Sequence, residues 1–415
     1  MRFGEVGSEM SPTPPRQAAR RPWQRQLFTA MGCAAIGLLV HFAGHAVPVQ
    51  LATVGLGIGV VGAAFLLAWA ADAGEAVFSG GFVLAAVALI AILPEFIVEI
   101  RFAYIQETEL VSANLTGATR LLITGAIATP VALAYIARRR GQAPGSFQLA
   151  TGRRLELGIM LVAAIFAIQI IARGSLTVID GVVLIALYLF YARRVQGTHD
   201  EEPAVVGVPA GLLTLPPRYV RLVITALIVG AAAVVVMIAN PFADALLATG
   251  TSLGMDPYLL IQTVVPVASE APEFVVVAVL VANHRPAQGL ALFLASSVTQ
   301  WTLALGALPI AYLAGGGGMA LPLAGRELVE LALTVALTFF CVAALAVLRP
   351  TRFDAWLVIG VFAVQLLYPT PFVRVAGTFV FLVFAIDLTV AHRRAVLSLF
   401  RTAFGGKRAR AEVQR

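Results

Sequence analysis

The sequence predicts an all-α, polytopic membrane protein that crosses the bilayer about 12 times. Hydrophobic residues make up 60% of its 415 positions and charged residues only 12%, a composition typical of chains with many membrane-spanning helices. Identical Pro-Glu-Phe triplets, at 94–96 and 272–274, lie within membrane-length apolar segments in the two halves of the chain. This recurrence predicts two inverted five-helix repeats, with one flanking helix at each end of the chain.

Twelve apolar segments are expected to be helices. In chain order they are 27–46, 50–72, 80–104, 110–136, 156–172, 175–192, 219–248, 257–282, 288–314, 327–348, 353–370 and 373–391. With the N-terminus in the cytoplasm, 24 of the 29 Lys and Arg residues fall on the cytoplasmic side. Because short cytoplasmic loops of membrane proteins are enriched in basic residues, both termini are expected in the cytoplasm, in a cell inner membrane or plasma membrane.

The loops and the repeats divide the chain into five expected regions. These are a disordered cytoplasmic leader (1–25), a first membrane repeat with an extra N-terminal helix (27–194), a central cytoplasmic loop (195–217), a second membrane repeat with an extra C-terminal helix (218–391) and a basic cytoplasmic tail (392–415). Connecting segments this short leave no room for a separate soluble domain.

Composition argues against several other classes of protein. The net charge of +7 follows the membrane topology, and no basic–aromatic pattern typical of a nucleic-acid-binding surface is visible. Cys33 and Cys341 lie in apolar segments, where packed thiols are expected rather than a disulfide. The sequence also shows no nucleotide motif and no Ser/His/Asp constellation, so a transporter is expected rather than an enzyme.

The two triplets place a carboxylate at bilayer depth, which costs about 2.5 kcal/mol or more unless it is compensated. Glu95 and Glu273 each follow a proline, which removes a helical hydrogen bond and frees a carbonyl oxygen. A helix break that carries a carboxylate and free carbonyls suits a cation. An Ala-Asp-Ala stretch precedes each triplet, at 71–73 and 243–245, and the two triplet-bearing segments run in opposite directions in the twelve-helix topology. This arrangement predicts a central site between inverted repeats.

These residues resemble the motifs of the cation/calcium antiporter superfamily, which includes sodium/calcium and calcium/proton exchangers. The family carries Gly-Thr-Ser-x-Pro-Glu in each of two inverted repeats, followed on the next helix by Gly-Asn-x-x-Gly-Ser-Asn. In the first repeat, residues 91–95 and 113–119 match in the spacing from Glu95 to Asn114 and Gly117. The resemblance implies a secondary active antiporter that exchanges Ca²⁺ or Na⁺ for H⁺ or Na⁺ by alternating access.

The second repeat matches the family motifs differently. Residues 269–273 end in Pro-Glu, Ser296 takes the place of the motif serine, and Gln300 takes the place of a cation-binding Asn or Asp. Glu270 adds a carboxylate where a hydroxyl is usual, whereas the first repeat has Ala118 where a serine is usual and lacks hydroxyls before its glutamate. The resemblance thus implies a site that is rich in carboxylates and poor in neutral ligands.

The expected cation ligands are carboxylate, hydroxyl and amide side chains, since such oxygens suit hard cations. They are Glu95, Glu273, Glu270, Ser269, Ser296, Gln300, Asn114 and Thr119, with Glu95 and Glu273 as the principal metal ligands. Arg120 and Glu99 are expected to modulate the charge of the site. Two interpretations stay open for Arg120, which either offsets part of the negative charge or forms a structural ion pair, for example with Glu99.

Carboxylates held close together repel one another when they are ionised, so protons and a metal cation are expected to compete for them. The expected ligands are therefore the transported cation, Ca²⁺ or Na⁺, and H⁺, with no resident cofactor. The expected partners are small inorganic cations and the lipid bilayer.

Two other functions remain open. The first repeat has lost motif hydroxyls, which favours a non-transporting scaffold or sensor built on the exchanger fold. His41 and His45, spaced i, i+4 in the first segment, could instead hold a metal or haem. A Pro-Glu pair can also be only a kink whose carboxylate pairs with an arginine.

The topology is testable by cysteine accessibility. A cysteine introduced at position 145 is expected to react only from the cytoplasmic side, and one at position 316 only from the opposite side, because an odd number of helices separates them. An impermeant thiol reagent applied to intact cells and to inverted vesicles measures this, and reaction of both from one side contradicts the twelve-helix topology.

Overall fold

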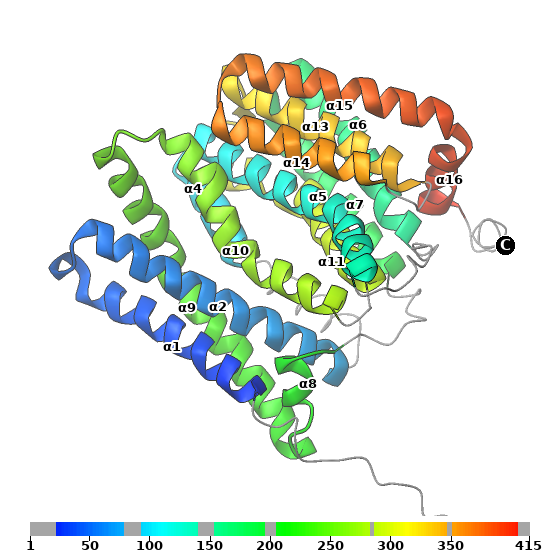
Figure 1. Cartoon of the computed structure of the whole chain (residues 1–415). Helices are drawn as coiled ribbons and strands as arrows, with labels where there is room; N and C mark the ends of the chain where they lie inside the picture. The colour runs from blue at the N-terminus through cyan, green and yellow to red at the C-terminus, as the bar shows by residue number, and fades with distance from the viewer. Residues whose placement is uncertain are drawn as a thin grey trace, which may run out of the picture.

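The chain folds as a bundle of α-helices (Figure 1). The computed structural model describes residues 22–78, 93–139, 153–195, 205–282, 286–346 and 351–405. The helices of the first half are α1 (Pro22–Ala43), the short 3₁₀ turn η1 (Gly44–Ala46), α2 (Val49–Val77), α4 (Leu93–Tyr104), α5 (Thr108–Arg139), α6 (Arg154–Arg173) and α7 (Val178–Val195).

The second half begins after a short linking helix, α8 (Val208–Leu212). Its helices are α9 (Pro217–Ser252), α10 (Pro257–Ala282), α11 (Pro286–Thr299), the π-helical turn η3 (Gln300–Ala304), α12 (Leu305–Ala314), α13 (Gly325–Ala346), α14 (Arg352–Leu367), α15 (Pro371–Ala391) and α16 (Arg393–Phe404). Two three-residue strands, β1 (Ser175–Thr177) and β2 (Ala320–Pro322), pair antiparallel and join the two halves.

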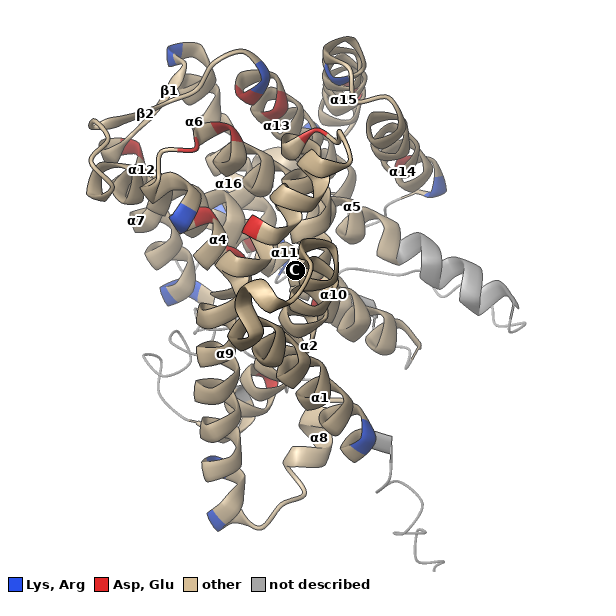
Figure 2. Ribbon diagram, turned by 90° about the vertical axis from the view of Figure 1, so that its left-hand side faces the viewer, with Lys and Arg blue, Asp and Glu red and all other residues tan. Residues whose placement is uncertain are grey.

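The predicted all-α membrane fold is confirmed. Each of the twelve expected segments overlaps with one or more helices, and 257–282 coincides with α10. Within the described ranges, nine helices are long and apolar enough to cross a membrane. Twelve crossings remain a prediction, since α4, α7 and α14 are not among those nine. In Figure 2 most Lys and Arg positions lie near helix ends, whereas acidic positions beside α4 lie within the bundle.

Three of the expected non-membrane regions contain helical residues. Helix α1 already starts at Pro22, because proline is favoured in the first turn of a helix, so the leader is shorter than 1–25. The central loop contains α8, and the basic tail begins with α16, whose apolar residues Val396, Leu399 and Ala403 are buried. Residues 1–21, 196–204 and 406–415 of these regions lie outside the described residues.

The helices form two groups (Figure 1). Helices α1, α2 and α9 pack together, and α5, α6, α13 and α15 form the second group, with α4 and α10 between the two. The end of the bundle at which α4 and α12 finish is called here the Tyr104 end, where the Gln106 amide donates to the Gly315 carbonyl. The opposite end, at which α2 and α10 finish, is called the Ala282 end.

Helix α10 runs without interruption through two prolines, Pro266 and Pro272, so the expected break at the second triplet is wrong. Pro266 has no N–H to donate, which leaves the Gln262 carbonyl without its helical partner. That carbonyl faces Gly117 of α5, where an added Cβ would lie 2.0 Å from the oxygen. The missing side chain at Gly117 therefore lets α5 and α10 approach closely near the start of α10, about three turns before the second triplet. The residues just before the first triplet, 79–92, lie outside the described residues.

Substituting Gly117 should separate α5 from α10. In Gly117→Ala the new Cβ would clash with a backbone oxygen that cannot turn away, so we expect a loss of about 1–3 kcal/mol of stability. Thermal unfolding of the purified protein in detergent measures it. Gly230→Ala is the matched control, because nothing lies within 4 Å of the Cβ at that position of α9. Equal unfolding temperatures for both variants would contradict the close approach.

Candidate functional site

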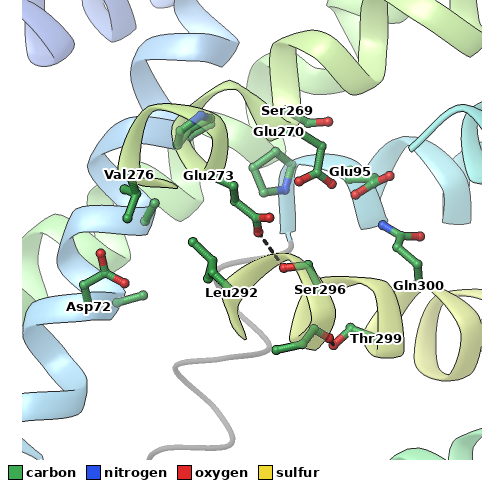
Figure 3. Close-up of a pocket in the computed structure, with 16 residues that line it drawn as sticks. Asp72, Glu95, Ser269, Glu270, Glu273, Val276, Leu292, Ser296, Thr299 and Gln300 are labelled. Carbon is green, nitrogen blue, oxygen red and sulfur yellow. Dashed lines mark hydrogen bonds between the residues drawn. The ribbon is translucent and has the colours of Figure 1, made fainter. Parts of the chain in front are cut away.

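A cavity of about 180 Å³ lies between α2, α4, α10 and α11 (Figure 3). Small and polar side chains form most of its wall. The lining residues are Ala64, Ala68, Ala71, Asp72, Pro94, Glu95, Ser269, Glu270, Pro272, Glu273, Val276, Leu292, Ala295, Ser296, Thr299 and Gln300. Both Pro-Glu pairs, which are far apart in the sequence, thus meet at one cavity.

Three carboxyl groups gather at this cavity. Glu95 comes from the first described turn of α4, and Glu270 and Glu273 lie one turn apart on the same face of α10. Glu95 is 4% exposed and Glu270 is 5% exposed, whereas Glu273 is partly buried. Glu270 interacts electrostatically with both of the others and lies between them in Figure 3. Among the described residues, no Lys or Arg lines the cavity.

Few neutral groups satisfy these carboxylates. The Ser296 hydroxyl donates a hydrogen bond of 2.9 Å to Glu273 Oε1. Glu95 Oε1 and Glu273 Oε2 are buried and have no hydrogen-bond partner among the residues that the structure describes. Buried oxygen atoms without partners are costly, so this cluster is suited to hold protons or a cation that supplies the missing positive charge.

Gln300 occupies a special position in the helix formed by α11, η3 and α12. It begins the π-helical turn η3, and such turns inside α-helices often occur at functional sites because they redirect side chains. Gln300 Oε1 is buried without a partner, and Figure 3 shows the side chain near Glu95. Gln300 also lines a second, smaller cavity of about 10 Å³ together with Thr119.

The remaining predicted ligands lie in different places. Ser269 lines the larger cavity, and its hydroxyl donates to the Val265 carbonyl at 3.1 Å. Thr119 donates to the Leu115 carbonyl at 2.7 Å and does not line that cavity. Asn114 also lies apart from the cavity.

Glu99 and Asn114 form a separate contact. The Asn114 amide donates to Glu99 Oε1 at 3.4 Å, and both side chains are fully buried. Glu99 is still close enough to Glu270 to interact with it electrostatically. This pair therefore borders the carboxylate cluster without lining the cavity.

Arg120 forms a structural ion pair, but with Glu330 of α13 rather than Glu99. Its Nη2 lies 2.7 Å from Glu330 Oε2, and Arg374 of α15 pairs with the other oxygen of Glu330. Arg120 Nη1 also donates to Gln365 of α14 at 3.3 Å. Arg120 is thus held away from the cavity by a buried cluster that links α5, α13, α14 and α15. Sequence reasoning missed Glu330, although a carboxylate inside the segment 327–348 is a signal of such a cluster.

The histidine pair does not share a helix face. Helix α1 ends at Ala43, since Gly44 has a φ of +54°, and His45 falls in η1. The His41 ring contacts Phe42, with ring centroids 5.3 Å apart. The expected i, i+4 arrangement is therefore wrong.

Within the described part of the chain, no group of three or more His, Cys, Asp and Glu residues is arranged to hold a metal ion. The three carboxyl groups at the cavity are therefore gathered but not closed around a common point. Side-chain rotation would be needed to bring their oxygens onto one cation.

Comparisons with known proteins are consistent with this geometry. A profile described as "Sodium/calcium exchanger protein" matches twice, to residues 47–195 and 223–370, so each half of the chain carries one copy. The crystal structure of the H⁺/Ca²⁺ exchanger CAX is similar with a TM-score of 0.84 and 30% identity, covering 94% of this chain and 100% of that one.

Two structures of YfkE share the fold. Native YfkE has a TM-score of 0.58 at 13% identity, covering 89% of this chain and 99% of its own. The selenium-substituted Ca²⁺/H⁺ antiporter protein YfkE has a TM-score of 0.56 at 13% identity, covering 87% and 99%. A search of curated proteins gave no match.

Removing the acid of the buried cluster should be costly for stability. Glu330→Gln leaves Arg120 and Arg374 buried without a counter-charge, so we expect a loss of about 3–5 kcal/mol. Asp256→Asn is the control, since its ion pair with Arg326 is partly exposed. Thermal unfolding in detergent compares them, and equal small losses would show that the buried cluster is not structural.

Proposed function

This chain belongs to the sodium/calcium exchanger protein family, and from that premise we propose that it exchanges Ca²⁺ for H⁺ by secondary active antiport. The observation that carries the proposal is the meeting of Glu95, Glu270 and Glu273 at one cavity, which no Lys or Arg of the described ranges lines. The similarity to a protein described as an H⁺/Ca²⁺ exchanger supports this choice of ions.

The donor set fits a hard divalent cation. Ca²⁺ takes six to eight oxygen ligands, and carboxylates can supply one or two each. The three carboxylates, the Ser296 hydroxyl and the Gln300 amide oxygen supply most of such a shell after small side-chain rotations, and water would complete it. Asn114 and Thr119, which lie apart from the cavity, are not needed as direct ligands.

Charge balance provides the coupling. Three carboxylates that bind Ca²⁺ cannot all stay ionised in the same apolar surroundings once the metal has left, because an uncompensated buried charge is costly. Protons then replace the metal on the same oxygens. Metal and protons thus alternate at one site, which is the requirement for exchange.

The cavity extends toward the Ala282 end. Asp72, Val276 and Leu292 line it on that side of the three carboxylates. With the termini in the cytoplasm, as the basic residues predict, this end faces the cytoplasm. In this state the site would therefore receive ions from the cytoplasm.

Removal of either paired acid should abolish exchange. We expect Glu95→Gln and Glu273→Gln each to lower Ca²⁺ transport by more than about 100-fold, because losing a direct ligand costs at least as much as losing a residue that only orients one. Proteoliposomes with a Ca²⁺-sensitive dye measure the rate. Glu109→Gln is the control, because Glu109 is exposed on α5 and does not line the cavity.

The same vesicles test the ions. A pH gradient with an acidic interior should drive Ca²⁺ uptake, and a pH-sensitive dye should report proton exit. Exchange of Na⁺ for Ca²⁺ without proton movement, independent of pH between about 6 and 8, would contradict the proposed ions. Absence of any cation flux in the wild-type protein would favour the scaffold or sensor alternative.

A further inference from the structure

A two-pronged ion pair joins the two halves of the chain near the Tyr104 end. Arg101 of α4 donates from Nη1 to Asp244 Oδ1 at 2.7 Å and from Nη2 to Asp244 Oδ2 at 2.9 Å. Its Nη1 also lies 3.5 Å from the Asn240 carbonyl of α9. Helix α4 belongs to the first half and α9 to the second, so the pair fixes one repeat against the other.

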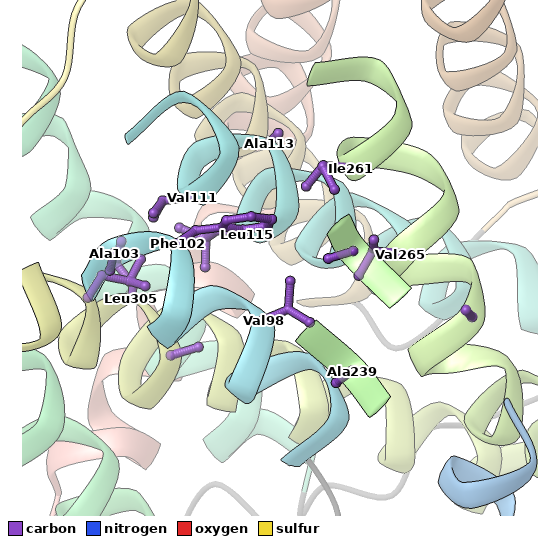
Figure 4. Packing of buried hydrophobic residues seen from close by; sticks show 14 of the residues in the cluster. Val98, Phe102, Ala103, Val111, Ala113, Leu115, Ala239, Ile261, Val265 and Leu305 are labelled. Carbon is purple, nitrogen blue, oxygen red and sulfur yellow. The ribbon is translucent and has the colours of Figure 1, made fainter. Parts of the chain in front are cut away.

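Between Glu95 and Arg101 along α4, Val98 belongs to a cluster of buried apolar side chains from α4, α5, α9, α10 and α12 (Figure 4). Val98 and Phe102 of α4 pack with Ala239 of α9 and with Ile261 and Val265 of α10. Val98 is 2% exposed and Phe102 is 1% exposed. The site is therefore closed toward the Tyr104 end within the described residues, whereas the cavity extends toward the Ala282 end.

The inverted repeat places corresponding residues near opposite ends of the bundle. The Ala-Asp-Ala stretches of α2 and α9 correspond to each other, and the first of them places Asp72 in the wall of the cavity on its Ala282 side. If the inverted repeats exchange roles, Asp244 comes to occupy the corresponding place at a cavity that opens to the Tyr104 end. In the present structure Arg101 pairs with the Asp244 carboxylate.

We propose that the Arg101–Asp244 ion pair is a latch that holds the Tyr104 end closed, and that its opening uncovers Asp244 at the mouth through which a cation reaches the site from that end. This inference rests on the proposed antiport function. In the closed state the Arg101 guanidinium binds both oxygens of Asp244. In the open state an arriving cation binds Asp244 in place of Arg101.

Two features suit the pair to this role. The Arg101 side chain is 27% exposed and that of Asp244 is 55% exposed, so the pair is not enclosed by the protein and can part without moving a packed core. Pro241 lies within α9 three residues before Asp244 and removes one helical hydrogen bond there. Helix α9 can therefore bend next to the latch without breaking another bond.

The test uses thiol labelling of purified protein in detergent, where both ends are accessible. In a background with Cys33→Ala and Cys341→Ala, Val98→Cys places a reporter in the apolar closure, and Leu292→Cys places another in the cavity. Arg101→Gln should raise the labelling rate at position 98 about two- to five-fold and lower it at position 292, as the loss of a partly exposed ion pair allows. Unchanged rates at position 98 would overturn the latch.

A matched control separates a latch from a general loosening. Arg326→Gln breaks the Arg326–Asp256 pair of 2.6 Å, which is also partly exposed but lies entirely within the second half. It should leave both labelling rates unchanged, and an equal rise at position 98 would overturn the proposal. The exchanged pair Arg101→Asp with Asp244→Arg should restore slow labelling, and its failure to do so while the protein stays folded would also count against the latch.

Because labelling does not depend on transport, its outcome is independent of the proposed ions. A latch confirmed by labelling in a protein without Ca²⁺/H⁺ exchange would leave the conformational inference standing and refute the proposed function. Normal Ca²⁺/H⁺ exchange together with an unchanged labelling rate at position 98 in Arg101→Gln would refute the latch and leave the proposed function standing.

Discussion

The fold depends on how an apolar helix bundle accommodates buried negative charge. Glu330 is neutralised by two arginines, Arg120 and Arg374, and the resulting cluster holds four helices together. Glu95 and Glu270 are also buried, but the described residues that line the cavity they face include no Lys or Arg. Buried acids thus occur in two settings, one neutralised by arginines of the protein itself and one in which, under the proposed function, mobile ions balance the charge.

Local features of the backbone position the helices that carry the three cavity carboxylates. Pro266 leaves the Gln262 carbonyl free, and Gly117 provides the space in which that carbonyl packs, so α5 and α10 meet closely. The π-helical turn at Gln300 then turns an amide toward the acids of the other repeat. Each feature weakens a helix locally, which is acceptable only because neighbouring helices hold it on the outside.

The sequence was sufficient to predict the membrane fold, the two halves and the residues of the second triplet that line the cavity. It could not place Asn114 and Thr119, because motif spacing identifies a helix but not the rotation that decides which face meets the cavity. It also could not identify the partner of Arg120, since Glu330 is 210 positions away and only tertiary packing brings them together. The prediction that His41 and His45 share a helix face was wrong because the helix ends just before Gly44, which lies between them.

The additional carboxylates make the site asymmetric. Glu95 and Glu273 correspond in the two repeats, but Glu99 follows the first by four residues and Glu270 precedes the second by three. Since α4 and α10 run in opposite directions, both additional acids lie on the Tyr104 side of the symmetric pair. If the site opens to either end, as proposed, the extra negative charge on one side favours unequal energies for the two open states. Arg101, two residues after Glu99, supplies a positive charge on that same side, and under the proposed latch its ion pair with Asp244 would couple this asymmetry to closure of the Tyr104 end.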